Sequence, residues 1–316
     1  MPFHNLTDRF NALFGALNPS PSFTATAQSE HSTVAALLTR TDLPCWRYLR
    51  PYIFLQGSYK QQTAIYTIND VDIVLLCNLG KSSLYQQGID ANNRYWTRDQ
   101  IFSVVAETLA ASHHYKGKIK YNSKSMCVKI ELGIKVEILP VLRRTLESPN
   151  TEEPFLLYRP AKDLWEDGFA RKHQSLLSEK NQRTGGNFIP AIKVFKHIRS
   201  FHNIPSVSFH IECLLYKIPD EVFKGSPAVY IAALLNHLQA SPAEAYKTTY
   251  LRTPCGDRDI FTSAEWEFES WKYFHSRIQS LSYAASIANL SQSKVDAITY
   301  WQKVLGDNYF PRWSNL

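Results

Sequence analysis

The sequence predicts an α+β protein in which a mixed half precedes a mostly helical half. Residues 71–76 form an apolar, β-branched run typical of a central strand. Residues 126–142 alternate in polarity like two antiparallel strands, and from about Leu164 onward apolar residues recur at helical spacing. We therefore expect two domains, residues 1–163 and 164–316.

The composition is that of a globular, mildly basic protein. The 316 residues carry 35 Lys and Arg against 28 Asp and Glu, a net charge of +7, and 44% are apolar. A positive excess fits an anionic ligand such as a nucleotide or nucleic acid. No apolar run approaches the ~20 residues of a membrane-spanning helix, so we expect a soluble, cytoplasmic protein without a membrane partner. Five scattered cysteines without a C-x-x-C pair argue against a zinc ribbon or a disulfide framework.

The first half is expected to begin with helices and to continue into a sheet. Residues 6–17 have helical spacing, and the Ser/Thr/Pro stretch at 19–32 is typical of a linker. Beyond it we expect a short helical run at 34–38, a strand at 52–55, the strand at 71–76, a helix at 98–112 and two strands within 126–142 that turn at Gly133.

The second half is expected to be mostly helical. The predicted helices span residues 164–180, 189–202, 209–217, 228–238, 265–289 and 294–305. Thr262 followed three residues later by Glu265 has the spacing of a capping box, in which each side chain reaches the other's free backbone N–H.

Gly57 and Ser58 stand where a predicted strand meets a predicted helix. Backbone N–H groups at such a junction, assisted by a Ser hydroxyl, can hold a phosphate, and glycine lets the chain approach the ligand closely. A Gly-Ser pair by itself is a common turn, so the motif gains weight only from the acids that follow it.

Two aspartates interrupt the next predicted strand. Asp70 and Asp72 occupy alternate positions, so both carboxylates project from one face while Val71 and Ile73 face the other way. Adjacent carboxylates on a buried strand repel each other, and unpaired buried charge is costly. A divalent cation such as Mg²⁺, which binds hard oxygen ligands and phosphates, would relieve this repulsion. A D-x-D pair alone is more often a solvated turn.

Glu137 is a third acid on a later predicted strand. It lies between two β-branched residues and faces the opposite way from them. With Asp70 and Asp72 it would complete a two-metal site, in which one cation activates an attacking hydroxyl and the other neutralises a leaving pyrophosphate. Glu131 on the preceding strand is the alternative third acid. The three motifs in this order indicate phosphoryl-transfer chemistry.

These motifs resemble a known superfamily. Residues 57–76, GSYKQQTAIYTINDVDIVLL, are similar to the G-S…D-x-D core of the DNA polymerase beta-like nucleotidyltransferases. More closely, the chain resembles the bacterial CD-NTases, the SMODS nucleotidyltransferases of CBASS anti-phage systems, and their relatives oligoadenylate synthase and cyclic GMP-AMP synthase. The helix around residues 192–196, the segment 206–212 and the W-x-K-x-x-G pattern at 301–306 also resemble this family.

The resemblance implies a bilobal protein with a polymerase beta-like core, a mixed β-sheet and a C-terminal helical lobe, with the active site in the cleft between lobes. It implies that Gly57 and Ser58 hold the β- and γ-phosphates. Asp70, Asp72 and Glu137 would bind two Mg²⁺ ions. The family's third acid is usually Asp, and the longer Glu137 could shift the metal position or favour Mn²⁺.

The resemblance also assigns phosphate contacts to the helical half. Lys196 and Ser208 would steady the triphosphate, with Lys193 as a further candidate. Lysines on an amphipathic helix usually form a solvated face, so Lys196 is assigned this role only by the resemblance.

The implied activity is synthesis of a cyclic di- or trinucleotide second messenger from nucleoside triphosphates, with release of pyrophosphate. The messenger would activate a separate effector protein in anti-phage defence, and the enzyme would be a monomer. Two alternatives remain open: an RNA-tailing or linear nucleotidyltransferase, and an inactive nucleotide-binding or sensing module. Nucleic-acid binding also stays open. The lysines at 116–124 could contact phosphates, but lysines without interleaved aromatic residues more often form an ordinary exposed loop.

Overall fold

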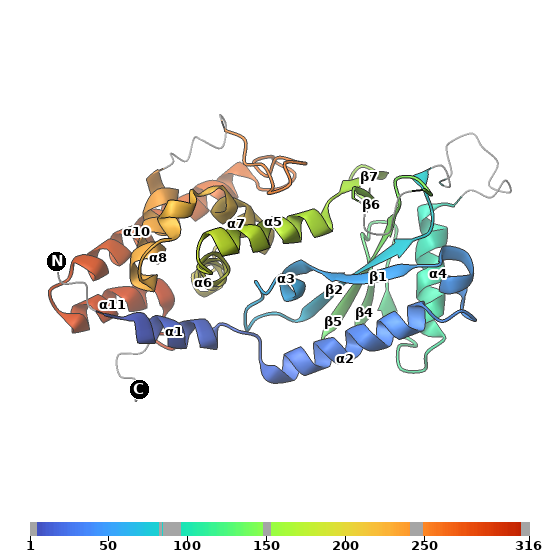
Figure 1. The fold of residues 1–316 in the computed structure, drawn as a ribbon, viewed down its shortest axis with the longest axis horizontal. Coiled ribbons are helices and arrows are strands. Elements are labelled where there is room, and N and C mark those ends of the chain that lie inside the picture. Colours follow the sequence, from blue (N-terminus) through green and yellow to red (C-terminus); the bar gives the residue numbers. More distant parts are fainter. Residues whose placement is uncertain (1–4, 82–83, 85–95, 148–152, 241–248, 311–316) are drawn as a thin grey trace. The chain divides into compact units, whose positions relative to one another are not determined.

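The computed structural model describes residues 5–81, 84, 96–147, 153–240 and 249–310 (Figure 1). The chain forms two compact units. One, the sheet unit, comprises residues 19–61 and 67–174; the other, the helical unit, comprises residues 1–18, 62–66 and 175–316. Neither unit is continuous in sequence, whereas the expected division at residue 163 assumes two continuous segments.

The sheet unit is built on one mixed sheet of seven strands in the described part of the chain. The strand order is β1-β2-β5-β4-β3, and β6 pairs with both β5 and β7. The central strands β2 and β5 are parallel, and the other pairs are antiparallel. The strands are β1 (Tyr52–Gln56), β2 (Asp70–Cys77), β3 (Ile119–Lys120), β4 (Val128–Glu131), β5 (Lys135–Leu142), β6 (Phe155–Arg159) and β7 (Leu164–Gly168).

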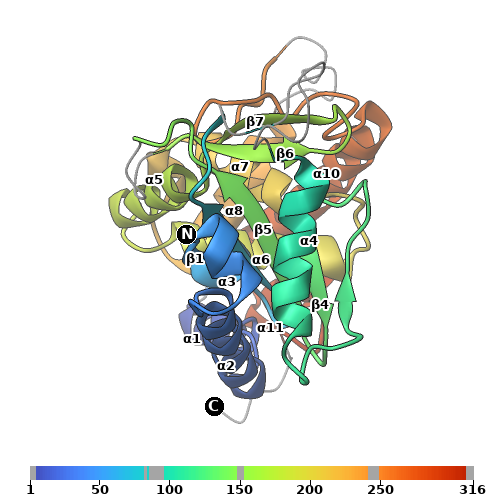
Figure 2. The same cartoon turned by 90° about the vertical axis from the view of Figure 1, so that its right-hand side faces the viewer.

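One face of this sheet is buried under two helices, α2 (Pro21–Leu38) and α4 (Arg98–Ala110) (Figure 2). Every second residue of β2, from Val71 to Cys77, joins this core. The intervening residues Asp70 and Asp72 therefore lie on the opposite face, as their alternation predicts. Val74 and Leu76 continue that opposite face and pack with Phe155 in a smaller apolar cluster.

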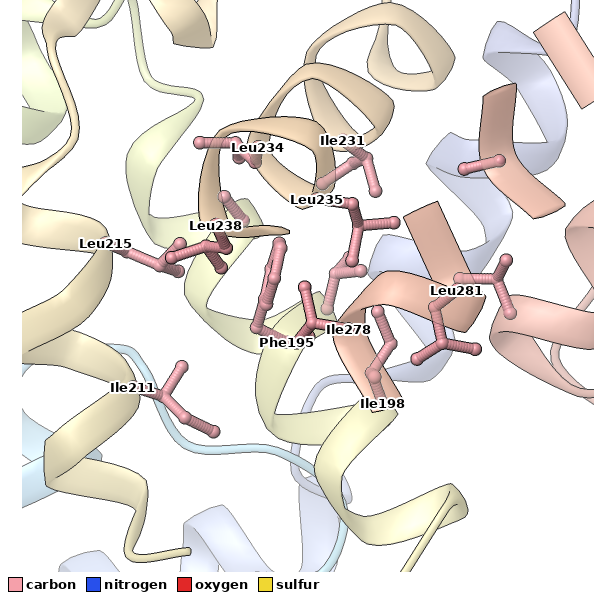
Figure 3. Packing of buried hydrophobic residues seen from close by; sticks show 14 of the residues in the cluster. Phe195, Ile198, Ile211, Leu215, Ile231, Leu234, Leu235, Leu238, Ile278 and Leu281 are labelled. Atoms are coloured by element: carbon pink, nitrogen blue, oxygen red, sulfur yellow. The ribbon is translucent and has the colours of Figure 1, made fainter. Parts of the chain in front are cut away.

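The helical unit packs its helices around an apolar core. Phe195 and Ile198 of α6 face Leu235 of α8 and Ile278 of α10 (Figure 3). The helices are α1 (Thr7–Ala16), α5 (Ala170–Arg183, which begins in the sheet unit), α6 (Phe188–Phe201), α7 (Ser208–Lys217), α8 (Pro227–Ala240), α10 (Phe268–Leu290) and α11 (Lys294–Leu305). The predicted helices at 189–202, 209–217, 228–238 and 294–305 are confirmed.

The predicted linker at 19–32 is wrong, because these residues form most of helix α2. Ser20 caps the helix by accepting a hydrogen bond from the Phe23 N–H, and Pro21 occupies the first turn, where its missing N–H costs nothing. Buried Ala27, together with Val34 further along the helix, anchors it on the sheet. Burial of this apolar stripe outweighs the low helix propensity of the Ser and Thr residues.

Two predicted helix starts are also wrong. The segment expected to be helical from Leu164 begins with strand β7, whose backbone pairs with β6 before α5 starts at Ala170. The helix expected at Glu265 starts at Phe268, and the Thr262 carbonyl accepts the Glu265 N–H in a turn. The described part of the chain contains a reciprocal capping box at another place, between Thr97 and Gln100 at the start of α4.

Two expectations from composition can be compared with the structure. No helix among the described residues is long and apolar enough to cross a membrane. Four of the five cysteines, Cys45, Cys77, Cys127 and Cys213, are buried thiols.

Candidate active site

The site is built on the face of the sheet that α2 and α4 leave uncovered. In the parallel register of β2 and β5, Asp72 lies beside Glu137 and Asp70 lies beside Lys135. Gln56 at the end of β1 lies opposite Asp72 on its other side. Residues paired across neighbouring strands point to the same face. The two aspartates and Glu137, far apart in sequence, are therefore brought together by the pairing of β2 with β5.

Lys129 of the next strand, β4, lies beside Glu137 on the same face of the sheet. It is the direct cross-strand partner of Glu137 in the β4–β5 hairpin, and its Nζ lies 2.5 Å from Glu137 Oε1. The Cys127 thiol, just before β4, donates a hydrogen bond to the other carboxylate oxygen at 3.6 Å. Both oxygens of Glu137 thus have a donor, whereas Glu131 lies on β4 and pairs with Lys120.

The two aspartates carry charges that their surroundings oppose. Burial raises the pKa of Asp72 to about 7, and the neighbouring charges of Asp70 and Glu137 act in the same direction. Burial, followed by the charge of Glu137, also raises the pKa of Asp70. Because these buried carboxylates repel one another, a bound cation would stabilise their ionised forms.

Gly57 opens the short helix α3 (Gly57–Lys60) directly after β1, as predicted. Its backbone has φ +73°, in the left-handed region that favours glycine. A Cβ at this position would lie 1.9 Å from Asp72 Oδ2 and 2.8 Å from Asp72 Cγ. The glycine is therefore required by both backbone conformation and space. Its close approach places the strand-to-helix turn beside the Asp72 carboxylate, and the next residue, Ser58, is half-buried.

The donor chemistry fits a divalent cation, since all three acids offer hard carboxylate oxygens. Among the residues that the structure describes, no three His, Cys, Asp or Glu side chains form a ready-made metal site. In this structure the Glu137 carboxylate forms an ion pair with Lys129.

Lys196 belongs to the helical unit and is almost completely buried. Its ammonium donates to Glu212 Oε1 at 2.7 Å and to the Thr63 carbonyl and hydroxyl at 3.1 and 3.0 Å. These bonds use all three of its N–H donors. Within this unit Lys196 links helix α6, helix α7 and the segment 62–66.

The other two residues assigned to the triphosphate lie on the same pair of helices. Ser208 begins α7, and its hydroxyl accepts a hydrogen bond from Arg199 at 3.2 Å. Lys193 lies one turn before Lys196 on α6 and donates to Asn18 Oδ1 at 2.6 Å.

Sequence reasoning missed Lys129, although the sequence contains the signal. A hairpin that turns at Gly133 places residues equally distant from the turn opposite each other, and Lys129 and Glu137 are each four residues away. The Cys127 contact has no such signal, because it depends on a side-chain orientation just outside the strand.

Comparison with known families settles the class of protein. A family model described as the Second Messenger Oligonucleotide or Dinucleotide Synthetase (SMODS) domain matches residues 5–181. The chain belongs to this family. A second model, the cGAS/DncV-like nucleotidyltransferase C-terminal helical domain, matches residues 175–282. This SMODS protein is therefore a bacterial CD-NTase, as its motifs predict.

Individual relatives agree with this assignment. A cyclic UMP-AMP synthase of Rhodothermus marinus is 26% identical over 274 residues, which cover 79% of this chain and 90% of the relative. The structure of the Rhodothermus marinus CdnE c-UMP-AMP synthase with Apcpp and Upnpp aligns with a TM-score of 0.64 at 23% identity, covering 87% of this chain and 95% of that one. Escherichia coli MS115-1 CdnC aligns with a TM-score of 0.70 at 14% identity, covering 96% and 98%.

Membership of the SMODS family confirms the expected fold class and activity. The protein is a nucleotidyltransferase of α+β fold, and its curated relatives are cyclic nucleotide synthases, the expected activity. The cyclic-nucleotide prediction fits these comparisons, whereas the linear or RNA-tailing alternative and the inactive alternative do not. Dependence on a divalent metal is general to this class of enzyme.

Proposed function

We propose that this chain joins nucleoside triphosphates into a cyclic dinucleotide or trinucleotide at the face of the sheet formed by β2 and β5. The observation that carries the proposal is the row in which Asp72 lies beside Glu137 and against Gly57. That row combines a carboxylate cluster, which can bind metal ions, with a strand-to-helix turn, which can bind phosphates, and both suit metal-assisted phosphoryl transfer.

The chain's own residues bind and orient in this proposal. Asp70, Asp72 and Glu137 would provide the oxygen ligands of two Mg²⁺ ions, which when bound would supply charge neutralisation and lower the pKa of the attacking hydroxyl. The turn at Gly57 and Ser58 holds the β- and γ-phosphates through backbone N–H groups and a hydroxyl. Most of the rate enhancement then comes from aligning a ribose hydroxyl with an α-phosphate.

Lys196 and Ser208 remain proposed contacts of the triphosphate. The proposal for Lys196 requires that its ammonium exchange at least one of its bonds to Thr63 or Glu212 for a phosphate oxygen. Ser208 would likewise exchange the hydrogen bond from Arg199.

The experiment incubates the purified protein with all four nucleoside triphosphates and Mg²⁺ or Mn²⁺, treats the mixture with phosphatase, and identifies surviving products by mass spectrometry. We expect a phosphatase-resistant cyclic species with wild-type protein. Glu137→Gln and Asp70→Asn with Asp72→Asn should abolish it, whereas Glu131→Gln, the matched acid on β4, should retain it. Linear products, or equal loss in Glu131→Gln and Glu137→Gln, would contradict the proposal.

Family membership also suggests the setting of the reaction. We propose a cytoplasmic monomer whose product activates a separate effector protein in anti-phage defence. Light scattering on the purified chain tests the monomer. Mixing the purified product with candidate effectors, beside its linear hydrolysis product, tests whether the cyclic form is the signal.

A further inference from the structure

In this structure the Glu137 carboxylate forms an ion pair with the ammonium group of Lys129. Its Oε1 lies 2.5 Å from Lys129 Nζ, and its Oε2 accepts a hydrogen bond from the Cys127 thiol. The exposed fractions of the Lys129 and Glu137 side chains are 42% and 25%, so solvent screens the pair only in part. A cation that approaches Glu137 must therefore displace an ammonium that is already bound.

The position of Lys129 follows from the hairpin. Residues 129 and 137 are directly opposite in the antiparallel register of β4 and β5, and Glu137 lies beside Asp72 in the parallel register of β5 and β2. Lys129 is consequently two strands away from Asp72, the carboxylate that faces Gly57, with Glu137 of β5 between them. Its charge acts on Glu137 by direct contact, and it repels any divalent cation that binds at the same carboxylate.

A second Lys-Glu pair on the same sheet provides a comparison. Lys120 of β3 contacts Glu131 of β4, and both side chains are more exposed than those of Lys129 and Glu137. Glu131 lies opposite Lys135 rather than beside an aspartate. Both pairs join a lysine to a glutamate, but only Glu137 lies beside Asp72 in the proposed metal site.

We propose that Lys129 is a positioning residue that holds Glu137 in the cation-free enzyme and releases it to a divalent cation, so that Lys129 sets the cation concentration at which the site fills. The inference rests on the proposed metal site. Lys129 neutralises the third carboxylate while no cation is bound, and competes with the cation when one arrives. Replacement of Lys129 by an uncharged side chain of similar length should therefore strengthen cation binding.

The test measures binding of Mn²⁺ alone, without nucleotide, by the electron paramagnetic resonance signal of free Mn²⁺. Lys129→Met should bind Mn²⁺ about fivefold more tightly than wild type, a ratio that corresponds to ~1 kcal/mol. Lys129→Arg, which keeps the charge, and Lys120→Met, which removes the comparison lysine, should stay within about twofold of wild type. Mn²⁺ should also raise the melting temperature of Lys129→Met more than that of wild type.

A double variant shows whether Lys129 acts through Glu137. In a Glu137→Gln background, Lys129→Met should change the Mn²⁺ affinity by less than about twofold. An unchanged or weaker affinity of Lys129→Met, or a full effect without Glu137, would overturn the inference. Failure of the metal site itself has a different signature, because Asp72→Asn would then bind Mn²⁺ as tightly as wild type.

Discussion

Asp72 combines a buried position with two neighbouring negative charges. The same burial and charges that raise its pKa to about 7 also make the metal-free protein less stable when Asp72 is ionised. Between the ordinary Asp value of 3.8 and about 7, the folded protein binds more protons than the unfolded chain. Stability contributed by this position is therefore lost as the pH rises through that range.

Asp72→Asn should consequently stabilise the metal-free protein at high pH. At pH 8 in a chelator we expect a melting temperature about 3 °C or more above wild type, since ~1 kcal/mol shifts it by roughly 2–4 °C in a protein of 150–250 residues. The difference should shrink towards pH 4, where Asp72 is protonated in the folded protein and only about half ionised in the unfolded chain. Thermal unfolding followed by circular dichroism checks this, and a variant less stable than wild type at pH 8 would contradict it.

Gly57 lies so close to the Asp72 carboxylate that any side chain at position 57 would clash with it. Gly57→Ala should lower the synthase rate at least about 100-fold, because the added methyl group displaces Asp72 and strains the backbone at φ +73°. Gly117 is the matched control. It has φ +78°, but nothing lies within 4 Å of an added Cβ, so Gly117→Ala should share the backbone strain and keep the activity. Similar activity in both variants would show that the contact with Asp72 is unimportant.

At the scale of elements, helix α6 gives the sharpest question, because Lys196 has a structural role as well as a proposed phosphate contact. Lys196→Met leaves the buried Glu212 carboxylate without its cation, which should cost about 3 kcal/mol or more. Lys196→Met with Glu212→Leu removes both charges and should recover most of that stability.

Activity separates the two roles of Lys196. If Lys196 also contacts the triphosphate, the double variant should melt near the wild-type temperature and still show a strongly raised KM for nucleotide. Thermal unfolding and initial-rate kinetics on the same preparations provide both readouts. A stable double variant with wild-type KM would remove Lys196 from the nucleotide-binding set.

Strands β2 and β5 and helices α6, α7, α8 and α11 could be predicted from the sequence because their apolar periodicity is strong and continuous. Helix α2 could not, because its many Ser and Thr residues resemble a linker and its buried stripe is only Ala27, Val34 and Leu38. The strand at Leu164 was concealed by its continuity with the helical pattern that follows. In the candidate site, Asp70, Asp72 and Glu137 are readable by type and alternation. The pairing of Lys196 with Glu212 is not, because it depends on tertiary packing.

At the scale of the whole molecule, local sequence patterns could not predict which segments of the chain fold together into each of the two units. Helix α1 belongs to the helical unit because Phe10 is fully buried there, with ring centroids 5.0 Å from Trp301 and 5.1 Å from Phe310. This contact joins the first and last described helices. Only a folded structure reveals such a long-range contact.

Phe10→Ala should destabilise the helical unit selectively. Loss of a buried Phe costs about 3–5 kcal/mol. Hydrogen exchange followed by mass spectrometry should then show faster exchange in α1, α6 and α11, and little change in β2 and β5. Phe14→Ala, which removes a partly buried neighbour on the same helix, should have a smaller effect. Equal loss of protection in the sheet strands would show that the two units unfold together.

The contact of Phe10 with Trp301 and Phe310 also has a consequence for biosynthesis. A ribosome that adds about 5–20 residues per second needs roughly 15–60 s to travel from Phe10 to Phe310. The residues of the sheet unit all leave the ribosome in that interval, before α11 exists. We expect the nascent chain to fold its sheet unit first, while the apolar stripe of helix α1 is still exposed. We therefore expect a chaperone that binds this chain during translation to contact α1.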